Sequence, residues 1–352
     1  MWPDQRIQNL FGIELPIVQA PMAGFVTAEM VIAVAEAGGL GSLPCALLSA
    51  DQLRAELRVI RQRTSYPINV NFFCHRVPEF DRERERAWRE RLASYYVELG
   101  LDPTAEIPIS TRTAFDDVMC DVLAEFKPEV VSFHFGLPES PLVARVKAMG
   151  AKVISSATTV EEARGLEREG CDAVIAQGYE AGGHRGMFLS RDVTTQLGTM
   201  ALVPQVVDAV TVPVIAAGGI ADARGIVAAF ALGAAGVQIG TGYLFCAEAK
   251  VSPLHRRALK ADGGHTAITN VLTGRPARAV VNRIVREVGP MSDLAPEFPL
   301  ASGAVMPLRA KSETDDFVPM WSGQAARLSP ELPAGELTRR LAEETLAKLS
   351  RC

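Results

Sequence analysis

Residues 153–176 read VISSATTVEEARGLEREGCDAVIA, and this stretch decides the fold. It begins with a short apolar run at 153–155, continues with an amphipathic segment at 160–169, and ends with a second apolar run at 173–176. Strands that are apolar on both faces are typical of parallel sheets covered by helices. The stretch therefore predicts one strand–helix–strand unit of a parallel α/β fold.

The same alternation runs through most of the chain. Eight short apolar runs are predicted to be strands, at residues 15–19, 40–43, 68–71, 130–133, 153–155, 173–176, 214–216 and 237–239. Helices are expected between most of them, for example at 27–37 and 223–232, and Ser49 with Gln52 forms a capping-box pattern. Eight such repeats predict a closed (β/α)8 TIM barrel. The alternative is a doubly wound open sheet, but no G-x-G-x-x-G motif follows the first strand.

Two stretches do not fit a minimal barrel. Residues 76–110 follow the third strand and alternate in charge, as in DRERER at 81–86, which predicts an inserted, solvent-exposed helix. Residues 265–352 show no strand alternation and many prolines, which predicts a helical C-terminal subdomain ending in a helix at about 333–349. We therefore divide the chain into a barrel at 1–264 and a C-terminal segment at 265–352 packed on it. We expect residues 290–321 to cover the barrel mouth.

Composition excludes several classes of protein. The chain has 352 residues, 48% of them hydrophobic, which is an ordinary globular balance and not that of a disordered chain. Its net charge of −5 disfavours nucleic-acid binding by phosphate neutralisation. No run is long enough for a membrane helix, and the N-terminus has no secretory pattern. The six cysteines form no C-x-x-C pair, so we expect no metal site and a cytoplasmic location with reduced thiols.

Glycine-rich loops follow the last two predicted strands. Barrel active sites form at the C-terminal ends of the strands, where Gly218-Gly219 and Gly240-Thr241 lie. Glycine lets backbone N–H groups approach an anion closely, and a helix N-terminus adds a favourable dipole. These two loops therefore predict a phosphate site, although the glycines could also serve only for tight turns. No Walker motif is present.

Three of the five histidines fall near predicted strand ends. His184 follows two glycines in a polar loop, which places a group suited to proton transfer beside the predicted ligand. His134 ends an apolar run and is expected to be a hydrogen-bonded wall residue. His75 adjoins Cys74, but sequence neighbours do not form a nucleophile–base pair, and partners for a metal role are not evident. No serine elbow or H-E-x-x-H motif occurs.

Four strand-end segments together carry a resemblance to a known family. They are QAPMAG at 19–24, QGYEAGGHRG at 177–186, AGGI at 217–220 and QIGT at 238–241. They resemble the nitronate monooxygenases, FMN-dependent barrel enzymes formerly called 2-nitropropane dioxygenases. The resemblance covers roughly residues 10–325, and NVNFFCH at 69–75 looks more like the class I enzymes. The EAGGH segment is also similar in flavin-dependent enoyl reductases and quinone reductases of the same superfamily.

The resemblance implies roles for individual residues. His184 would be the catalytic base and His134 would line the pocket. FMN contacts are implied for Pro21, Met22, Ala23, Asn71, Gln177, Gly182, Gly219, Gln238, Ile239, Gly240 and Thr241, to which the glycine pattern adds Gly218. One departure concerns residues 300–308, which contain none of the tyrosines that class I members carry there. That departure leaves the substrate open, including one that is larger or more apolar than a small nitronate.

Three functions follow as hypotheses. The first is FMN-dependent oxidation of an alkyl nitronate or nitroalkane by O2. The second is an FMN-dependent reductase that passes hydride from NAD(P)H to a quinone or an enoyl thioester. The third, least favoured by the complete set of strand-end motifs, is a non-catalytic barrel that binds a phosphate ligand. Nothing in the sequence indicates the oligomeric state.

Overall fold

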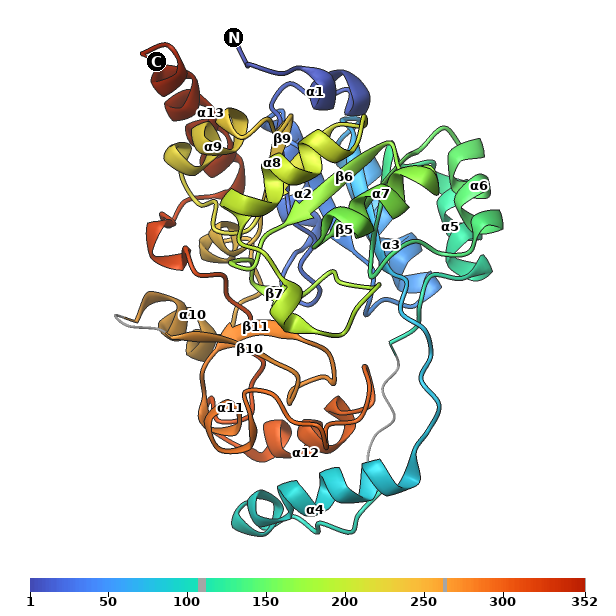
Figure 1. Cartoon of the computed structure of the whole chain (residues 1–352), viewed down its shortest axis with the longest axis vertical. Coiled ribbons are helices and arrows are strands. Elements are labelled where there is room, and N and C mark those ends of the chain that lie inside the picture. The colour runs from blue at the N-terminus through green and yellow to red at the C-terminus, as the bar shows by residue number, and fades with distance from the viewer. Residues whose placement is uncertain (107–111, 262–264, 352) are drawn as a thin grey trace.

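A computed structural model describes residues 1–106, 112–261 and 265–351. Its centre is a closed barrel of eight parallel strands (Figure 1). In chain order they are β1 (Ile17–Gln19), β2 (Gly41–Pro44), β3 (Ile68–Phe73), β4 (Val130–His134), β5 (Lys152–Ala157), β6 (Ala173–Gln177), β8 (Val214–Ala217) and β9 (Gly236–Ile239). Strand β1 pairs with β9, and a parallel bridge from Val18 to Leu40 closes the barrel toward β2. The predicted TIM barrel is confirmed.

Helices surround the barrel and begin where the sequence supplies caps. They are α2 (Ala28–Glu36), α3 (Ala50–Arg63), α5 (Asp117–Phe126), α6 (Ser140–Ala148), α7 (Val160–Arg168), α8 (Thr199–Ala209) and α9 (Ala223–Ala231). Thr27, Thr159 and Asp222 accept hydrogen bonds from backbone N–H groups of the first helical turn. Ser49 and Gln52 form the predicted capping box at α3. Each cap satisfies donors that would otherwise lack partners at a helix start.

The barrel interior is filled at its N-terminal end. Short helix α1 (Arg6–Phe11) inserts Ile7 and Phe11, which are 0% and 3% exposed, among the inward side chains of the strands. A larger core lies between the strands and the outer helices. Because one end is plugged by apolar side chains, the only open end among the described residues is the one where the strands finish.

The insertion after β3 forms helix α4 (Arg82–Glu98), as predicted, but the helix is not simply solvated. One face is buried against helix α12 (Ser302–Lys311) of the C-terminal segment (Figure 1). The Trp88 indole N–H donates to the Ala301 carbonyl at 3.2 Å, and the Tyr96 hydroxyl donates to the Ala304 carbonyl at 2.6 Å. Within 300–308, where class I tyrosines were sought, Ala301, Ala304, Val305 and Leu308 are buried in this contact, and no residue of the stretch lines the cavity described below.

The expectation that residues 265–352 contain no strands is wrong. Strands β10 (Thr266–Thr269) and β11 (Ala277–Val280) form an antiparallel sheet with β7 (Gly183–His184). Strands of four residues are too short to show a clear alternation in the sequence. The segment also contains helices α11 (Arg283–Val288), α12 and the predicted final helix, α13 (Ala334–Leu349), joined by turns and irregular stretches. Helix α10 (Pro253–Lys260) precedes it.

The final helix returns to the barrel. Helix α13 packs against α2 and α9, whereas α11 and α12 lie beyond the barrel mouth, next to α4 (Figure 1). The division of the chain at 264/265 stays a prediction. Across the described residues, none of the helices combines the length and the apolar character that crossing a bilayer requires.

Candidate active site

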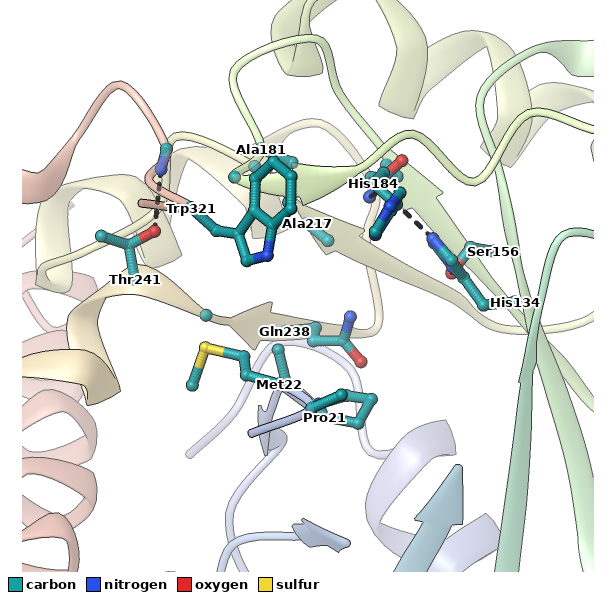
Figure 2. Close-up of a pocket in the computed structure, with 18 of the residues that line it drawn as sticks. Pro21, Met22, His134, Ser156, Ala181, His184, Ala217, Gln238, Thr241 and Trp321 are labelled. Carbon is teal, nitrogen blue, oxygen red and sulfur yellow. Dashed lines mark hydrogen bonds between the residues drawn. The ribbon is translucent and has the colours of Figure 1, made fainter. Parts of the chain in front are cut away.

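A cavity of about 1360 Å³, counting the solvent at its mouth, lies at the C-terminal ends of the strands. Figure 2 shows Pro21, Met22 and Gln238 on one side of it and Ala181, Ala217 and Trp321 on the other. It brings together nearly all of the predicted site residues, namely Pro21, Met22, Ala23, Asn71, His134, Gln177, Gly182, His184, Gly218, Gly219, Gln238, Gly240 and Thr241. Ile239 is the exception, because its side chain is buried in the core between strands and helices.

The glycine loop after β8 has the backbone geometry that requires glycine. Gly218 and Gly219 have φ values of 109° and 71°, in the left-handed region. A Cβ on Gly219 would lie 3.3 Å from the Cβ of Glu180, whose carboxylate accepts the Thr199 N–H at 2.8 Å. Glu180 is therefore a structural acceptor behind the loop. The loop leaves backbone N–H groups uncovered by side chains, which is the arrangement that binds phosphate.

Thr241 links the loop after β9 to the C-terminal segment. Its hydroxyl accepts a hydrogen bond of 2.9 Å from the backbone N–H of Gly323 (Figure 2). Both residues line the cavity, and so does Trp321 two positions earlier. The C-terminal segment therefore forms one wall of the site, and this wall is held to the barrel at a predicted phosphate loop.

Gln177 and Arg185 hold the loop that carries His184. Gln177 accepts the Gly186 N–H at 2.7 Å through Oε1 and donates to the His184 carbonyl at 3.0 Å through Nε2. Arg185 is fully buried and donates to the carbonyls of Gln177 and Gly178 at 2.8 and 2.7 Å. Burial lowers the Arg185 pKa to about 10. Sequence reasoning did not assign this structural role, although Arg185 lies in the quoted motif.

His134 is a satisfied wall residue, as its place in the sequence predicted. Its Nε2 bonds to the His184 carbonyl at 3.1 Å, and its Nδ1 bonds to the Ser156 hydroxyl at 3.2 Å (Figure 2). A ring nitrogen facing a carbonyl must donate, so in the neutral ring Nδ1 accepts from Ser156. Burial lowers the His134 pKa to about 3. His134 is therefore a neutral support for the His184 backbone and is poorly suited to be a base.

His184 sits inside a cage of aromatic rings. Its ring centroid lies 6.0 Å from that of Phe73, 5.9 Å from Phe135, and 5.2 Å from both Phe298 and Trp321. Burial lowers the His184 pKa well below 6.5, and the nearby cation Arg112 adds to this effect. The imidazole is therefore neutral at pH 7, which is the state a general base requires.

One ring nitrogen of His184 is already engaged. Nε2 shares a hydrogen bond of 3.0 Å with the hydroxyl of Thr273, which lies in the turn between β10 and β11. Thr273 does not line the cavity, whereas His184 does. Among the described residues no hydrogen bond reaches Nδ1. The Thr273 hydroxyl can accept a hydrogen bond from a protonated Nε2, and in that tautomer Nδ1 is the nitrogen available for proton exchange.

Several residues of the site escaped sequence reasoning. Phe73 lies in a segment quoted for the resemblance, so its motif could have indicated it, and Trp321 falls within the range of 10–325 that the resemblance covers. Phe298 and Arg112 follow no recognisable pattern, and only the fold brings them to the cage. His75 lies behind the cavity, with its ring 4.9 Å from that of Phe298, and burial lowers its pKa to about 4.

Comparison with known proteins identifies relatives over nearly the whole chain. Residues 4–344 match the family described as nitronate monooxygenase. The chain is 42% identical over 345 residues to a nitronate monooxygenase from Pseudomonas aeruginosa, covering 96% of this chain and 98% of the relative. A solved nitroalkane oxidase from Streptomyces ansochromogenes superposes with a TM-score of 0.89 at 38% identity, covering 98% and 99% of the two chains. FabK from Thermotoga maritima is similar with a TM-score of 0.75 at 29% identity, covering 100% and 98%.

Proposed function

The chain belongs to the nitronate monooxygenase family and is an oxidoreductase, and from that premise we propose that it oxidises alkyl nitronates with O2, using FMN bound at the barrel mouth. The observation that carries the proposal is the meeting of two glycine loops and a caged, neutral histidine in one cavity. A phosphate loop without the histidine would fit many ligands. A neutral histidine without the glycine loops would not indicate a nucleotide cofactor.

The residues present fit a flavin mononucleotide. Gln238 Oε1 is buried and has no hydrogen-bond partner among the described residues, so it supplies an acceptor for a donor on a bound group. Gly218, Gly219, Gly240 and Thr241 would hold the phosphate through backbone N–H groups. Pro21 and Met22 would offer an apolar surface beside Gln238 (Figure 2).

FMN, when bound, takes electrons from the substrate and passes them to O2. The chain's own residues position the substrate and move its proton. A nitronate arrives without its α-proton, whereas a neutral nitroalkane must lose it, and His184 Nδ1 would accept it. The aromatic cage excludes water from this nitrogen, which keeps the imidazole neutral and strengthens its interactions.

Anaerobic mixing tests the proposal and separates it from the reductase alternative. An alkyl nitronate added without NAD(P)H should bleach the visible flavin band of the purified protein. Bleaching by NAD(P)H alone, with no response to nitronate, would favour a reductase acting on a quinone or enoyl thioester. A colourless protein that takes up no FMN would favour the non-catalytic binding barrel.

Two further features of the chain support the proposal. Trp321 lines the cavity and Phe298 contacts His184, which supports a covering role for residues 290–321 within the C-terminal segment. The five described cysteines form no disulfide, which fits the proposed location in the reducing cytoplasm.

The pH dependence should reflect the depressed pKa of His184. Burial and Arg112 favour the neutral ring, so the base stays deprotonated as the pH falls through 6.5. For a neutral nitroalkane, kcat/KM should therefore hold down to pH 6.5, and its acidic limb should lie below that value. A profile of kcat/KM between pH 5 and 9, with freshly diluted nitroalkane, measures this. An acidic limb centred at 6.5 or above would contradict it.

Thr273 should act as a positioning residue for His184. Thr273→Val keeps the side-chain shape but removes the hydroxyl that would accept a hydrogen bond from Nε2–H and so hold the proton there. We expect kcat/KM for neutral nitroalkanes to fall about tenfold, the effect of one hydrogen bond of ordinary strength. Activity on nitronates should change little, and Thr273→Ser should restore the loss. Equal losses on both substrate forms would indicate that Thr273 only stabilises the turn.

A further inference from the structure

The lining of the cavity is almost free of charge. Apart from Arg112, the described residues that line it carry no formally charged side chain. The polar groups are those of histidines, amides and hydroxyls, and the remainder are glycines and apolar side chains. The Arg112 guanidinium therefore makes the lining of the cavity positively charged.

Arg112 lies against the same ring as His184. Its guanidinium carbon is 5.6 Å from the centroid of the Phe298 ring, and that centroid is 5.2 Å from the centroid of the His184 ring. Both side chains also line the cavity. A substrate whose α-carbon faces His184 therefore has the Arg112 cation within the same part of the site.

The charges around the aromatic cage also favour the binding of an anion. Arg112 is the charged group that acts most strongly on His184, and Arg275, with its guanidinium 3.8 Å from the Phe135 ring centroid, adds a second positive field. The pKa of Arg112 is itself lowered by burial and by Arg309. A partly desolvated cation in a positive field is stabilised when an anion binds beside it.

We propose that Arg112 determines specificity by binding the negatively charged nitro group of a nitronate and by stabilising the same charge as it develops on a neutral nitroalkane. This inference rests on the proposed function. In the nitroalkane step, the α-proton passes to His184 Nδ1, and the electron pair of the broken C–H bond spreads onto the nitro oxygens. A planar guanidinium can donate two parallel hydrogen bonds to two such oxygens, which an ammonium group cannot reproduce.

The test compares Arg112→Met with Arg309→Met, both as FMN-loaded proteins. Arg309 lies on α12, acts on Arg112 through its charge and does not line the cavity, so it controls for the general loss of a cation. Nitrate, a planar anion that is not oxidised, is the binding probe, and its Kd is measured by calorimetry. The KM for an alkyl nitronate and the kcat for the matching neutral nitroalkane are measured in parallel.

In Arg112→Met, the Kd for nitrate and the KM for nitronate should each rise about 10- to 100-fold, as expected for loss of a charge-assisted hydrogen bond. The kcat for the nitroalkane should fall, while its KM changes little because the neutral substrate lacks the charge. Arg112→Lys should give intermediate values, and Arg309→Met should match the wild type. If Arg112→Met lost FMN, Arg112→Gln would replace it as the neutral variant.

Wild-type affinity for nitrate and nitronate in a flavin-loaded neutral variant would overturn the inference. Equal losses in Arg309→Met would also overturn it, since they would indicate the overall field rather than contact. Failure of the proposed function gives a different pattern. In that case nitronate would not bleach the wild-type flavin, yet nitrate binding would still depend on Arg112.

Discussion

Replacing His184 with asparagine should lower kcat/KM for neutral nitroalkanes by about 10²- to 10⁴-fold, the usual contribution of a general base. Asparagine keeps a polar group of similar reach inside the aromatic cage but cannot accept a proton at neutral pH. The loop should keep its shape, because Gln177 and His134 bond to the backbone carbonyl at position 184 and not to the ring. Steady-state oxygen consumption with freshly diluted nitroalkane measures the effect.

The matched control is the same variant acting on the nitronate. A nitronate has already lost its α-proton, so His184→Asn should oxidise it far better than it oxidises the nitroalkane. Wild-type rates on both substrate forms would remove His184 from the mechanism. Loss of FMN from the variant would instead indicate that the histidine serves only to shape the loop.

Gly219→Val should abolish FMN binding without unfolding the barrel. Gly219 has a φ of 71°, which a β-branched residue adopts only with strain of about 1–3 kcal/mol. Its Cβ would also lie 3.3 Å from the Cβ of Glu180, and the isopropyl group would cover the backbone N–H groups of the loop. The visible flavin band should disappear after gel filtration, while the far-UV circular dichroism stays close to that of the wild type.

Gly150→Val provides the control for backbone strain. Gly150 also has a positive φ, of 91°, but a Cβ there would have no neighbour within 4 Å, and the residue lies outside the cavity. That variant should therefore carry a similar conformational penalty and still bind FMN. Retention of FMN by Gly219→Val at wild-type occupancy would show that the loop after β8 does not bind the phosphate.

Much of the fold was predictable because its signals are local. The apolar runs at 153–155 and 173–176 coincide with β5 and β6, the helix expected at 27–37 coincides with α2, and the capping box at Ser49 coincides with the start of α3. The strands β10 and β11 were not predictable, since each has only four residues. Their sheet is completed by β7, which comes from a loop more than 80 residues earlier in the chain.

Helix α4, in the insertion, also shows what a local sequence pattern does not predict. The alternating charges at its start correctly indicate a helix, yet they say nothing about its opposite face. Trp88 is completely buried because α12 supplies an apolar partner. A helix is solvated or buried according to what packs against it, and that partner is distant in sequence.

The sequence by itself determined the strand–helix order, the glycines that need left-handed backbone, and the placing of His184 on a strand-end loop. These follow from local conformational preference and from barrel topology, which carries the C-terminal ends of all strands to one rim. Only the tertiary structure decided that Thr273 engages one nitrogen of that histidine and that Arg112 supplies the charge in the cavity. Hydrogen bonds and fields act over a few ångströms, so they depend on which distant segments meet, and no local pattern records that.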